Sequence, residues 1–430
     1  MPNRKTFITA VVSNQAGEVF DLDGYAAVGM AGSTLVPLTL DDTMNMPFGS
    51  ELMLLPERRP VVYNIRQHQM EELKENPFSP GEPVFPVAAF NSPGYMISYV
   101  SAYEKNESAG FLPLFSYGAV GWHKGRFRSA VILVDREKRQ DLRLMKPQDV
   151  IDGIKSIQKE MPNNRLETHL EKCAVEYCCP AAKNFFLGRY EAPLPTSPRC
   201  NARCFGCLSL QKNSKIPHSQ DRIAFKPTSE EIAEVALFHI KRVKRSVVSF
   251  GQGCEGEPLL AADVIEPAIK ILRSQTKNGT INMNTNGSRP DILTNLLDAG
   301  LDSVRISMNS PRKPCYDAYF RPKGYTFEDV IKSIETALNK NKFVSVNYLN
   351  SPGFTDTPEE FNALAQLISA YPIHMIQWRN LNFDPKKYWE IMSAVVKPGK
   401  PMGMHRIILQ IKKSFPNVKH GYFNPPKEKF

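Results

Sequence analysis

The sequence predicts an α/β fold for the second half of the chain, preceded by a β-rich α+β domain. With 430 residues, of which 42% are hydrophobic and 23% charged, the chain has a globular composition and room for two or three domains. In the first third, short runs rich in Val, Tyr and Phe are bordered by Gly, Asn and Pro, which is typical of strands. From about residue 190, apolar runs alternate regularly with segments that carry helix-start signals.

Residues 1–165 predict the β-rich domain, to which the sequence assigns no chemistry. A helix is expected near residues 149–159, and an extended, proline-rich connector at residues 76–86. Residues 166–189, which contain cysteines, are expected to connect this domain to the next. The expected strands are residues 6–12, 51–55, 60–63, 84–90, 95–100 and 129–134.

The following segment predicts a layer of parallel strands, because most of its apolar runs are apolar on both faces. Thr228 with Glu231 and Thr357 with Glu360 fit the capping box of helix starts. Such a layer can curl into a barrel or lie open, and in both arrangements ligands gather at the carboxyl ends of the strands. The expected strands are residues 192–195, 246–251, 280–284, 303–308, 343–349 and 374–380.

A compact cysteine-rich loop follows the first of these strands. Cys200, Cys204 and Cys207 lie at spacings of four and three residues, and thiolates are the ligands that iron–sulfur clusters take. A cubane cluster has four irons, so three cysteine ligands leave one iron open to bind another molecule. Catalytic zinc sites keep an open coordination position for the same purpose. The loop therefore predicts a [4Fe-4S] cluster with a vacant coordination site.

This loop resembles the hallmark of the radical S-adenosylmethionine (radical SAM) superfamily, Cys-x3-Cys-x2-Cys. The segment from Gly253 to Pro258 is similar to the Gly-Gly-Glu-Pro motif of the family, and the segment from Asn284 to Gly287 resembles its Thr-Asn-Gly motif. The resemblance implies that residues 190–385 form a partial (β/α)6 TIM-type barrel. One position departs from the pattern, because Gly206 precedes the third cysteine where the family usually has an aromatic residue.

The resemblance also implies a function. A [4Fe-4S] cluster on the three cysteines would bind S-adenosylmethionine and cleave it reductively to a 5′-deoxyadenosyl radical, which abstracts hydrogen from a substrate. The electron would come from a one-electron reductant such as flavodoxin or ferredoxin. The substrate can be a peptide, an RNA or a metabolite, and no catalytic residue is assigned. The implied contacts to S-adenosylmethionine are Gly256, Glu257, Asn286, Ser307, Asn309, Asn347 and Arg379, with Gln377 as an alternative to Arg379.

Two other classes of function stay open. One is an RNA-modifying radical SAM enzyme that uses the basic C-terminal extension at residues 386–430, since residues 311–430 hold 18 Lys plus Arg against 10 Asp plus Glu. The other is a non-enzymatic iron–sulfur or zinc-binding protein, in which a distant His or Cys would complete a zinc site.

Four further cysteines offer a second cluster or a radical-relay thiol, but the adjacent pair Cys178 and Cys179 suits one cluster poorly. Together with Cys173 and Cys254 they are interpreted as small buried side chains. No stretch reaches the roughly 18 apolar residues of a membrane helix, and the apolar run at residues 7–12 is not followed by a cleavage site. The sequence therefore predicts a cytoplasmic protein with no membrane partner.

Overall fold

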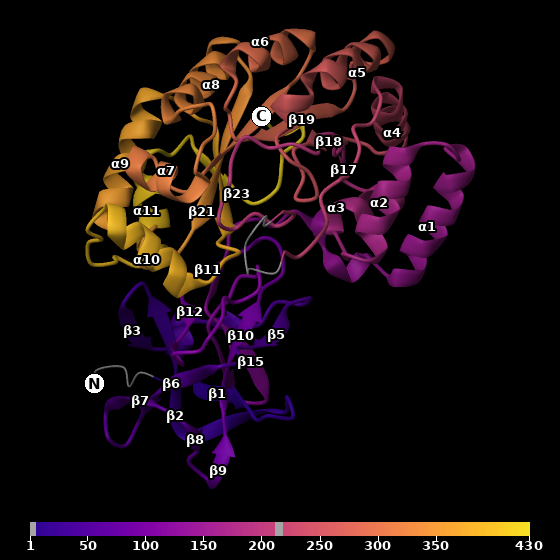
Figure 1. Cartoon of the computed structure of the whole chain (residues 1–430). Helices are drawn as coiled ribbons and strands as arrows, with labels where there is room; N and C mark the ends of the chain where they lie inside the picture. The colour runs from indigo at the N-terminus through magenta and orange to yellow at the C-terminus, as the bar shows by residue number, and fades with distance from the viewer. Residues whose placement is uncertain (1–5, 211–217) are drawn as a thin grey trace.

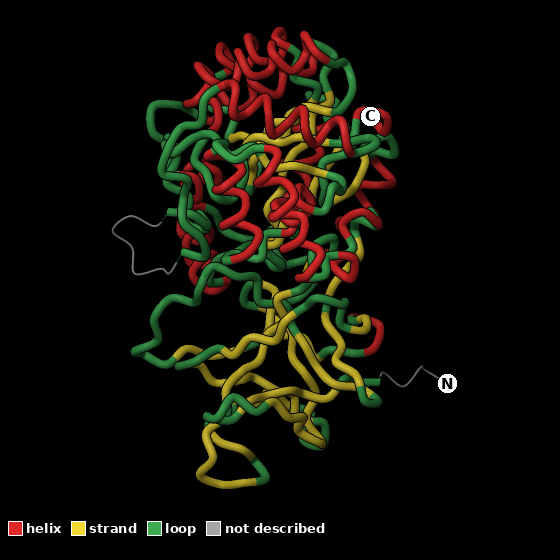
Figure 2. The backbone as a smooth tube through the Cα atoms, turned by 90° about the vertical axis from the view of Figure 1, so that its right-hand side faces the viewer, coloured by secondary structure: helices red, strands yellow, loops and turns green. Residues whose placement is uncertain are grey.

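The chain folds into a strand-rich part and a helix-rich part that lie one above the other (Figures 1 and 2). The computed structural model describes residues 6–210 and 218–430. The N-terminal residues form the strand-rich part, and the helix-rich part holds a curled parallel sheet with helices along its outer side (Figure 1). The predicted fold class, a partial TIM-type barrel with a β-rich N-terminal domain, is confirmed.

The N-terminal domain is built on a branched antiparallel sheet whose longest strand is residues 19–31. The sequence analysis missed this strand, because Asp21, Asp23 and Gly24 are residue types that are rare in strands. The connector predicted at residues 76–86 is wrong in part, since most of that segment pairs as a small hairpin. The strands are β1 (Thr9–Ser13), β2 (Val19–Ala31), β3 (Thr34–Pro37), β4 (Met44–Asn45), β5 (Glu51–Leu54), β6 (Arg58–Asn64), β7 (Gln69–Glu72), β8 (Glu75–Asn76), β9 (Ser79–Pro83), β10 (Phe85–Phe90), β11 (Tyr95–Ile97), β12 (Val100–Ser101), β13 (Tyr103–Lys105), β14 (Val120–His123), β15 (Arg126–Ser129) and β16 (Val131–Leu133).

Three helices connect the N-terminal domain to the barrel: α1 (Pro147–Glu160), α2 (Arg165–Val175) and α3 (Pro180–Phe186). The helix expected near residues 149–159 is therefore confirmed. Each of the three buries one apolar face in the same core as the barrel helices. In the described ranges, no helix combines the length and apolar character needed to span a bilayer.

The barrel sheet is parallel, and its strands follow one another in chain order. The sequence analysis expected six strands, and the structure adds a seventh from the segment interpreted as a basic extension. The elements are β17 (Glu191–Pro193), α4 (Ser229–Arg242), β18 (Val247–Phe250), α5 (Ala262–Gln275), β19 (Thr280–Thr285), α6 (Pro290–Ala299), β20 (Ser303–Met308), α7 (Lys313–Phe320), α8 (Phe327–Asn339), β21 (Phe343–Asn350), α9 (Pro358–Ala370), β22 (Met375–Asn380), α10 (Pro385–Val395), α11 (Met404–Ser414) and β23 (Lys419–Gly421).

The two faces of this sheet differ in character, because side chains alternate along a strand. In β20, Val304, Ile306 and Met308 are buried in the apolar core shared with the surrounding helices. Arg305 points to the other face, where its Nη1 donates to Gln377 Oε1 at 3.0 Å. The concave side of the half-barrel is therefore polar and the convex side apolar.

Helix starts follow the predicted chemistry in one of the two capping boxes. At α4, Thr228 Oγ1 accepts from Glu231 N, and the carboxylate of Glu231 accepts from Thr228 N. At α9, Thr357 Oγ1 accepts from Glu360 N, but the carboxylate of Glu360 turns away. It accepts instead from Ser310, Arg312 and Tyr348. The second capping box is therefore wrong in part, because a buried ion pair takes the carboxylate.

The N-terminal domain docks at the carboxyl ends of two barrel strands. Asn350, at the end of β21, donates its Nδ2 to Ile97 O at 2.8 Å, and Asn380, at the end of β22, accepts from Ile97 N at 2.9 Å. The carboxylate of Asp384 accepts from Arg58 Nη2 and from the Tyr103 hydroxyl, both at 3.2 Å. The domain therefore covers part of the strand edge at which ligands gather in such folds.

We expect the change Asp384→Ala to loosen this interface. Arg58 and Asp384 are both almost fully buried, and breaking a buried pair leaves the remaining charge without compensation, at a cost of about 3–5 kcal/mol. The matched control is Asp291→Ala, which breaks the exposed pair with Arg289 and should cost less than about 1 kcal/mol. Denaturant unfolding followed by circular dichroism measures both, and equal midpoints for the two variants would contradict the assignment.

Candidate functional site

The three cysteines lie on the loop that follows β17, at the carboxyl edge of the sheet. Cys200, Cys204 and Cys207 are half-buried. Within the described part of the chain, their sulfur atoms do not all come within 4.8 Å of one another, although ligands of one tetrahedral zinc ion would. Ligands of a cluster bind different metal atoms and lie farther apart. Three thiolates on one loop are a donor set that fits an iron–sulfur cluster.

Backbone hydrogen bonds hold this loop against α7 and the residues that follow it. Arg203 N donates to Phe320 O at 2.9 Å, and Lys323 N donates to Asn201 O at 2.8 Å. The loop has no regular secondary structure of its own, so these bonds to a helix end position the thiols.

Burial shifts the pKa of two of these thiols, Cys200 and Cys204. It raises the pKa of Cys200 to about 11, with a smaller contribution from the nearby Glu257 carboxylate. It also raises the pKa of Cys204 well above the ordinary value for a thiol. A metal cluster would displace these protons, because thiolates are its ligands. Arg222, which the sequence analysis did not single out, donates its Nη2 to Cys207 Sγ at 3.4 Å.

The buried carboxylate of Glu255 joins the loop after β17 to the loop after β18. Its Oε2 accepts from Thr196 N at 2.7 Å and from Ser197 N at 3.0 Å. Its Oε1 accepts from Gly251 N at 2.6 Å and from Gln252 N at 2.8 Å. The sequence analysis quoted Glu255 within a motif but gave it no role. Its hydrogen bonds fix the position of both loops.

Gly256 lies where the two loops come closest. Its N–H donates to Ser197 O at 2.6 Å, and a Cβ atom at this position would collide with the carbonyl of Arg199. Only glycine fits such an approach without displacing backbone. The motif loop is thereby held directly against the start of the cysteine loop.

The side chain of Glu257 is buried and only partly satisfied. It accepts from the Thr285 hydroxyl, from Asn286 N at 2.8 Å and from Leu259 N at 3.2 Å. A carboxylate offers about four acceptor positions, so one remains for a further donor. Burial raises the pKa of Glu257 to about 7, while the three donors act in the opposite direction.

Asn286 links the third motif to the cysteine loop. Its Nδ2 donates to Asn201 Oδ1 at 2.9 Å, and Asn201 donates in turn to the hydroxyl of Ser288 at 2.9 Å. Asn201 lies directly after Cys200 in the sequence. The structure therefore brings together the three motifs, although they are up to 87 residues apart along the chain.

The other predicted contacts divide into two groups. Ser307 and Asn347 are paired in register on the polar concave face, next to Gln377. Asn347 Oδ1 is buried and has no hydrogen-bond partner among the described residues, so it is an available acceptor. Arg379 lies on the same face, with its guanidinium 4.0 Å from the ring centre of Tyr422.

Asn309 lies elsewhere, on the helix-covered side of the site. It is fully buried, and its Nδ2 donates to Cys315 O at 3.0 Å and to the Tyr388 hydroxyl at 3.3 Å. These partners belong to α7 and α10. Its Oδ1 has no hydrogen-bond partner among the described residues, and its assignment as a cofactor contact stays a prediction.

Gly206, the residue before the third cysteine, lies against the side chain of Tyr319. A Cβ on Gly206 would lie 2.5 Å from the hydroxyl of Tyr319, so the ring of Tyr319 occupies the space beside this residue. Phe205 instead packs between the guanidinium of Arg321 at 4.0 Å and the ring of Phe383 at 5.7 Å. The aromatic residue of this loop thus helps to pack the loop on its surroundings.

Three histidines outside the site have ordinary hydrogen-bond or ion-pair partners. His239 is buried, and its Nε2 donates to Tyr190 O at 3.4 Å. His374 Nδ1 accepts from Val344 N at 3.1 Å, and exposed His218 lies 3.3 Å from Asp221.

The central region of the chain is similar to known proteins. Residues 194–368 match the family model described as Radical SAM superfamily. This segment is a radical SAM domain, and enzymes of the radical SAM superfamily bind a [4Fe-4S] cluster and S-adenosylmethionine.

Similar curated proteins share this central region. Molybdenum cofactor biosynthesis protein 1 from Homo sapiens is 26% identical over 200 residues, which cover 46% of this chain and 29% of that protein. The protein of the same name from Bos taurus is 27% identical over 214 residues, which cover 49% of this chain and 31% of that protein. The chain therefore matches less than a third of the length of these relatives.

Among solved structures, HydG, a maturase of the [FeFe]-hydrogenase, matches with a TM-score of 0.35 and 17% identity, over 65% of this chain and 69% of that one. Methylornithine synthase matches with a TM-score of 0.39 and 15% identity, over 56% and 68% of the two chains.

We expect the change Gly256→Ala to disturb the cysteine loop. The added methyl group collides with the backbone of Arg199, and overpacking of this kind costs about 1–3 kcal/mol. Iron bound per chain after anaerobic reconstitution should therefore fall. Gly110→Ala is the matched control, because a Cβ there meets no atom within 4 Å. A Gly256→Ala variant with the iron content and unfolding midpoint of the control would show that the close approach is not needed.

Proposed function

We propose that Cys200, Cys204 and Cys207 hold a [4Fe-4S] cluster and that the neighbouring motifs hold S-adenosylmethionine at the carboxyl edge of the sheet. The observation that carries this proposal is the set of hydrogen bonds that join the cysteine loop and the two other motif loops. When bound, the two cofactors would supply a 5′-deoxyadenosyl radical that abstracts a hydrogen atom from the substrate. The electron would come from a reductant such as flavodoxin or ferredoxin.

In this proposal the chain binds and orients S-adenosylmethionine and excludes water from the site. The open acceptor position on Glu257 takes the ammonium group of S-adenosylmethionine, since a buried carboxylate bonds a charged donor strongly. Gly256 provides a backbone surface without a side chain, and Asn347 Oδ1 is free to accept from a hydroxyl. The low exposure of Glu257 and Asn286 excludes water from the same region. These are tasks of positioning, which supply much of the rate in such chemistry.

The N-terminal domain forms one wall of the substrate entrance in this proposal. Its Phe111 stacks on Phe383 with ring centres 6.5 Å apart, and Phe383 packs on Phe205 of the cysteine loop. Phe111 is 39% exposed, so this row of rings reaches solvent. A substrate that enters between the domain and the barrel would meet an apolar surface before the polar concave face.

An RNA substrate receives no particular support from the basic C-terminal residues. Lys429 pairs with Glu137 at 2.8 Å, and Lys427 donates to Lys277 O. Asn424 inserts into the concave face, where its Nδ2 donates to Glu191 at 2.8 Å and its Oδ1 accepts from Gln377 at 3.0 Å. The segment is thus built into the barrel.

Anaerobic reconstitution with iron and sulfide, followed by chemical reduction with S-adenosylmethionine, tests the proposal. We expect 5′-deoxyadenosine in the chromatogram, and we expect Cys204→Ala to abolish both cluster absorption and this product. Cys178 is exposed, so its interpretation as a buried side chain is wrong, and Cys178→Ser is the matched control that should leave both unchanged. Production of 5′-deoxyadenosine by Cys204→Ala at the parent rate would refute the ligand assignment.

The change Glu257→Gln separates cofactor binding from cluster binding. It keeps the shape of the side chain but removes its charge, and a hydrogen bond to a charged group contributes about 1.5–3 kcal/mol. We therefore expect the dissociation constant for S-adenosylmethionine, measured by equilibrium dialysis, to rise about ten- to hundredfold. The cluster absorption should remain that of the parent. Unchanged affinity would place the ammonium group elsewhere.

A further inference from the structure

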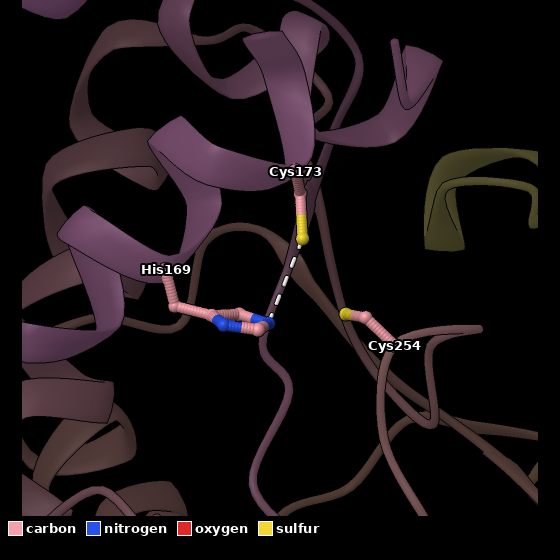
Figure 3. Close-up of side chains that lie close together, drawn as sticks. All are labelled: His169, Cys173 and Cys254. Atoms are coloured by element: carbon pink, nitrogen blue, oxygen red, sulfur yellow. Dashed lines mark hydrogen bonds between the residues drawn. The ribbon is translucent and has the colours of Figure 1, made fainter. Parts of the chain in front are cut away.

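A second group of metal-binding side chains lies outside the proposed cluster site. His169 and Cys173 on α2 and Cys254 in the loop after β18 place their ligand atoms within 4.8 Å of one another. Figure 3 shows the imidazole and the two thiols pointing toward one another from these two segments. Cys173 and Cys254 are buried, and His169 is half-buried. The sequence analysis did not consider His169, although its spacing of four residues from Cys173 places both on one helix face.

The geometry of this group fits one tetrahedral ion. His169 Nε2 lies 3.5 Å from Cys173 Sγ. Zinc binds sulfur at about 2.3 Å and imidazole nitrogen at about 2.0–2.1 Å, so tetrahedral angles place these two atoms about 3.5 Å apart. The atoms therefore already have the separation that a shared zinc ion would impose. Cys254 Sγ lies within 4.8 Å of both atoms, as a third ligand must.

The segments that carry these ligands are fixed by other contacts. Asn164 caps α2 and also donates to Glu231 O at 3.0 Å and to Glu234 Oε2 at 2.7 Å, both on α4. The carbonyl of Cys254 accepts from Ile223 N at 2.7 Å. Ligands on rigid supports lose little freedom when a metal binds, which favours a preformed site.

We propose that His169, Cys173 and Cys254 bind one zinc ion, with a water molecule as the fourth ligand. Two thiolates and an imidazole suit a borderline-soft divalent cation, and zinc accepts this ligand set with one open position. Water would reach the ion from the half-buried side of His169. The ligands are too close together to serve separate metal atoms of a cluster, in contrast to the three cysteines of the loop after β17.

This ion would tie α2 to the loop that carries Gly256 and Glu257. Cys254 lies two and three residues before them, and Glu255 between them already binds the loop after β17. A zinc ion at Cys254 would therefore fix the motif loop from its other side. The assignment of the ion itself does not depend on the proposed radical chemistry.

Metal analysis of the full-length protein tests the assignment. The protein is prepared without oxygen, supplied with zinc and iron, and dialysed against a weak chelator. We expect about one zinc per chain, and a loss of at least about tenfold in zinc affinity for both Cys173→Ser and His169→Gln. Cys204→Ala should lose iron and keep zinc, which separates this proposal from the previous one. Cys178→Ser, at a nearby exposed position, should keep both metals.

Three results would overturn the zinc assignment. The first is a parent protein that binds no zinc. The second is full retention of zinc by both Cys173→Ser and His169→Gln. The third is that these two variants lose iron and sulfide instead of zinc. The variant Cys173→Ser changes a buried residue and can lose zinc because it misfolds. His169→Gln controls for this outcome, because His169 is only half-buried and its replacement leaves the core intact. Cobalt substitution gives a second readout, since cobalt bound by two thiolates shows intense visible absorption bands. Parent protein without these bands would also contradict the site.

Discussion

The arrangement of the site depends on the hydrogen bonds that the carboxylate of Glu255 accepts. This carboxylate is buried and takes hydrogen bonds from Thr196 and Ser197 after β17 and from Gly251 and Gln252 after β18. A buried charge is costly unless its acceptor positions are filled. Both loops must therefore keep their conformation for the chain to hold this charge. The cysteine loop begins directly after one of them, and the motif of Gly256 and Glu257 follows the other.

A second constraint is the division of the sheet into a polar and an apolar face. The apolar face packs on helices, which leaves the concave face free to hold polar groups such as Arg305, Asn347 and Gln377. The N-terminal domain closes part of the carboxyl edge through the buried pair of Arg58 and Asp384. The site is thus enclosed by a rigid sheet below and a docked domain beside it, which suits chemistry that has to exclude water.

Much of the barrel could be predicted from the sequence. The strand at residues 303–308 was predicted with its observed bounds, because apolar runs and capping residues report on local structure. The role of Glu360 was not predictable, since its partner Arg312 lies 48 residues away. The same holds for Asn309, whose burial depends on α7 and α10. His169 could have been found from its spacing to Cys173, but Cys254 reaches it only through the fold.

The proposals separate two kinds of metal site by the distances between their ligands. His169, Cys173 and Cys254 lie within 4.8 Å of one another, as the ligands of one ion do, whereas the three cysteines of the loop after β17 do not form such a group among the described residues. Only the arrangement on this loop leaves an iron open to a small molecule, and the whole account of function depends on that iron.

Electron paramagnetic resonance of the reduced protein tests this claim most directly. The spectrum is recorded without and with S-adenosylmethionine that carries oxygen-17 in its carboxylate. The account predicts that the cluster spectrum changes when S-adenosylmethionine is added and that it couples to the labelled oxygen, because the open iron would then take a ligand from that molecule. A cluster spectrum that is the same in both samples, with no such coupling, would contradict it.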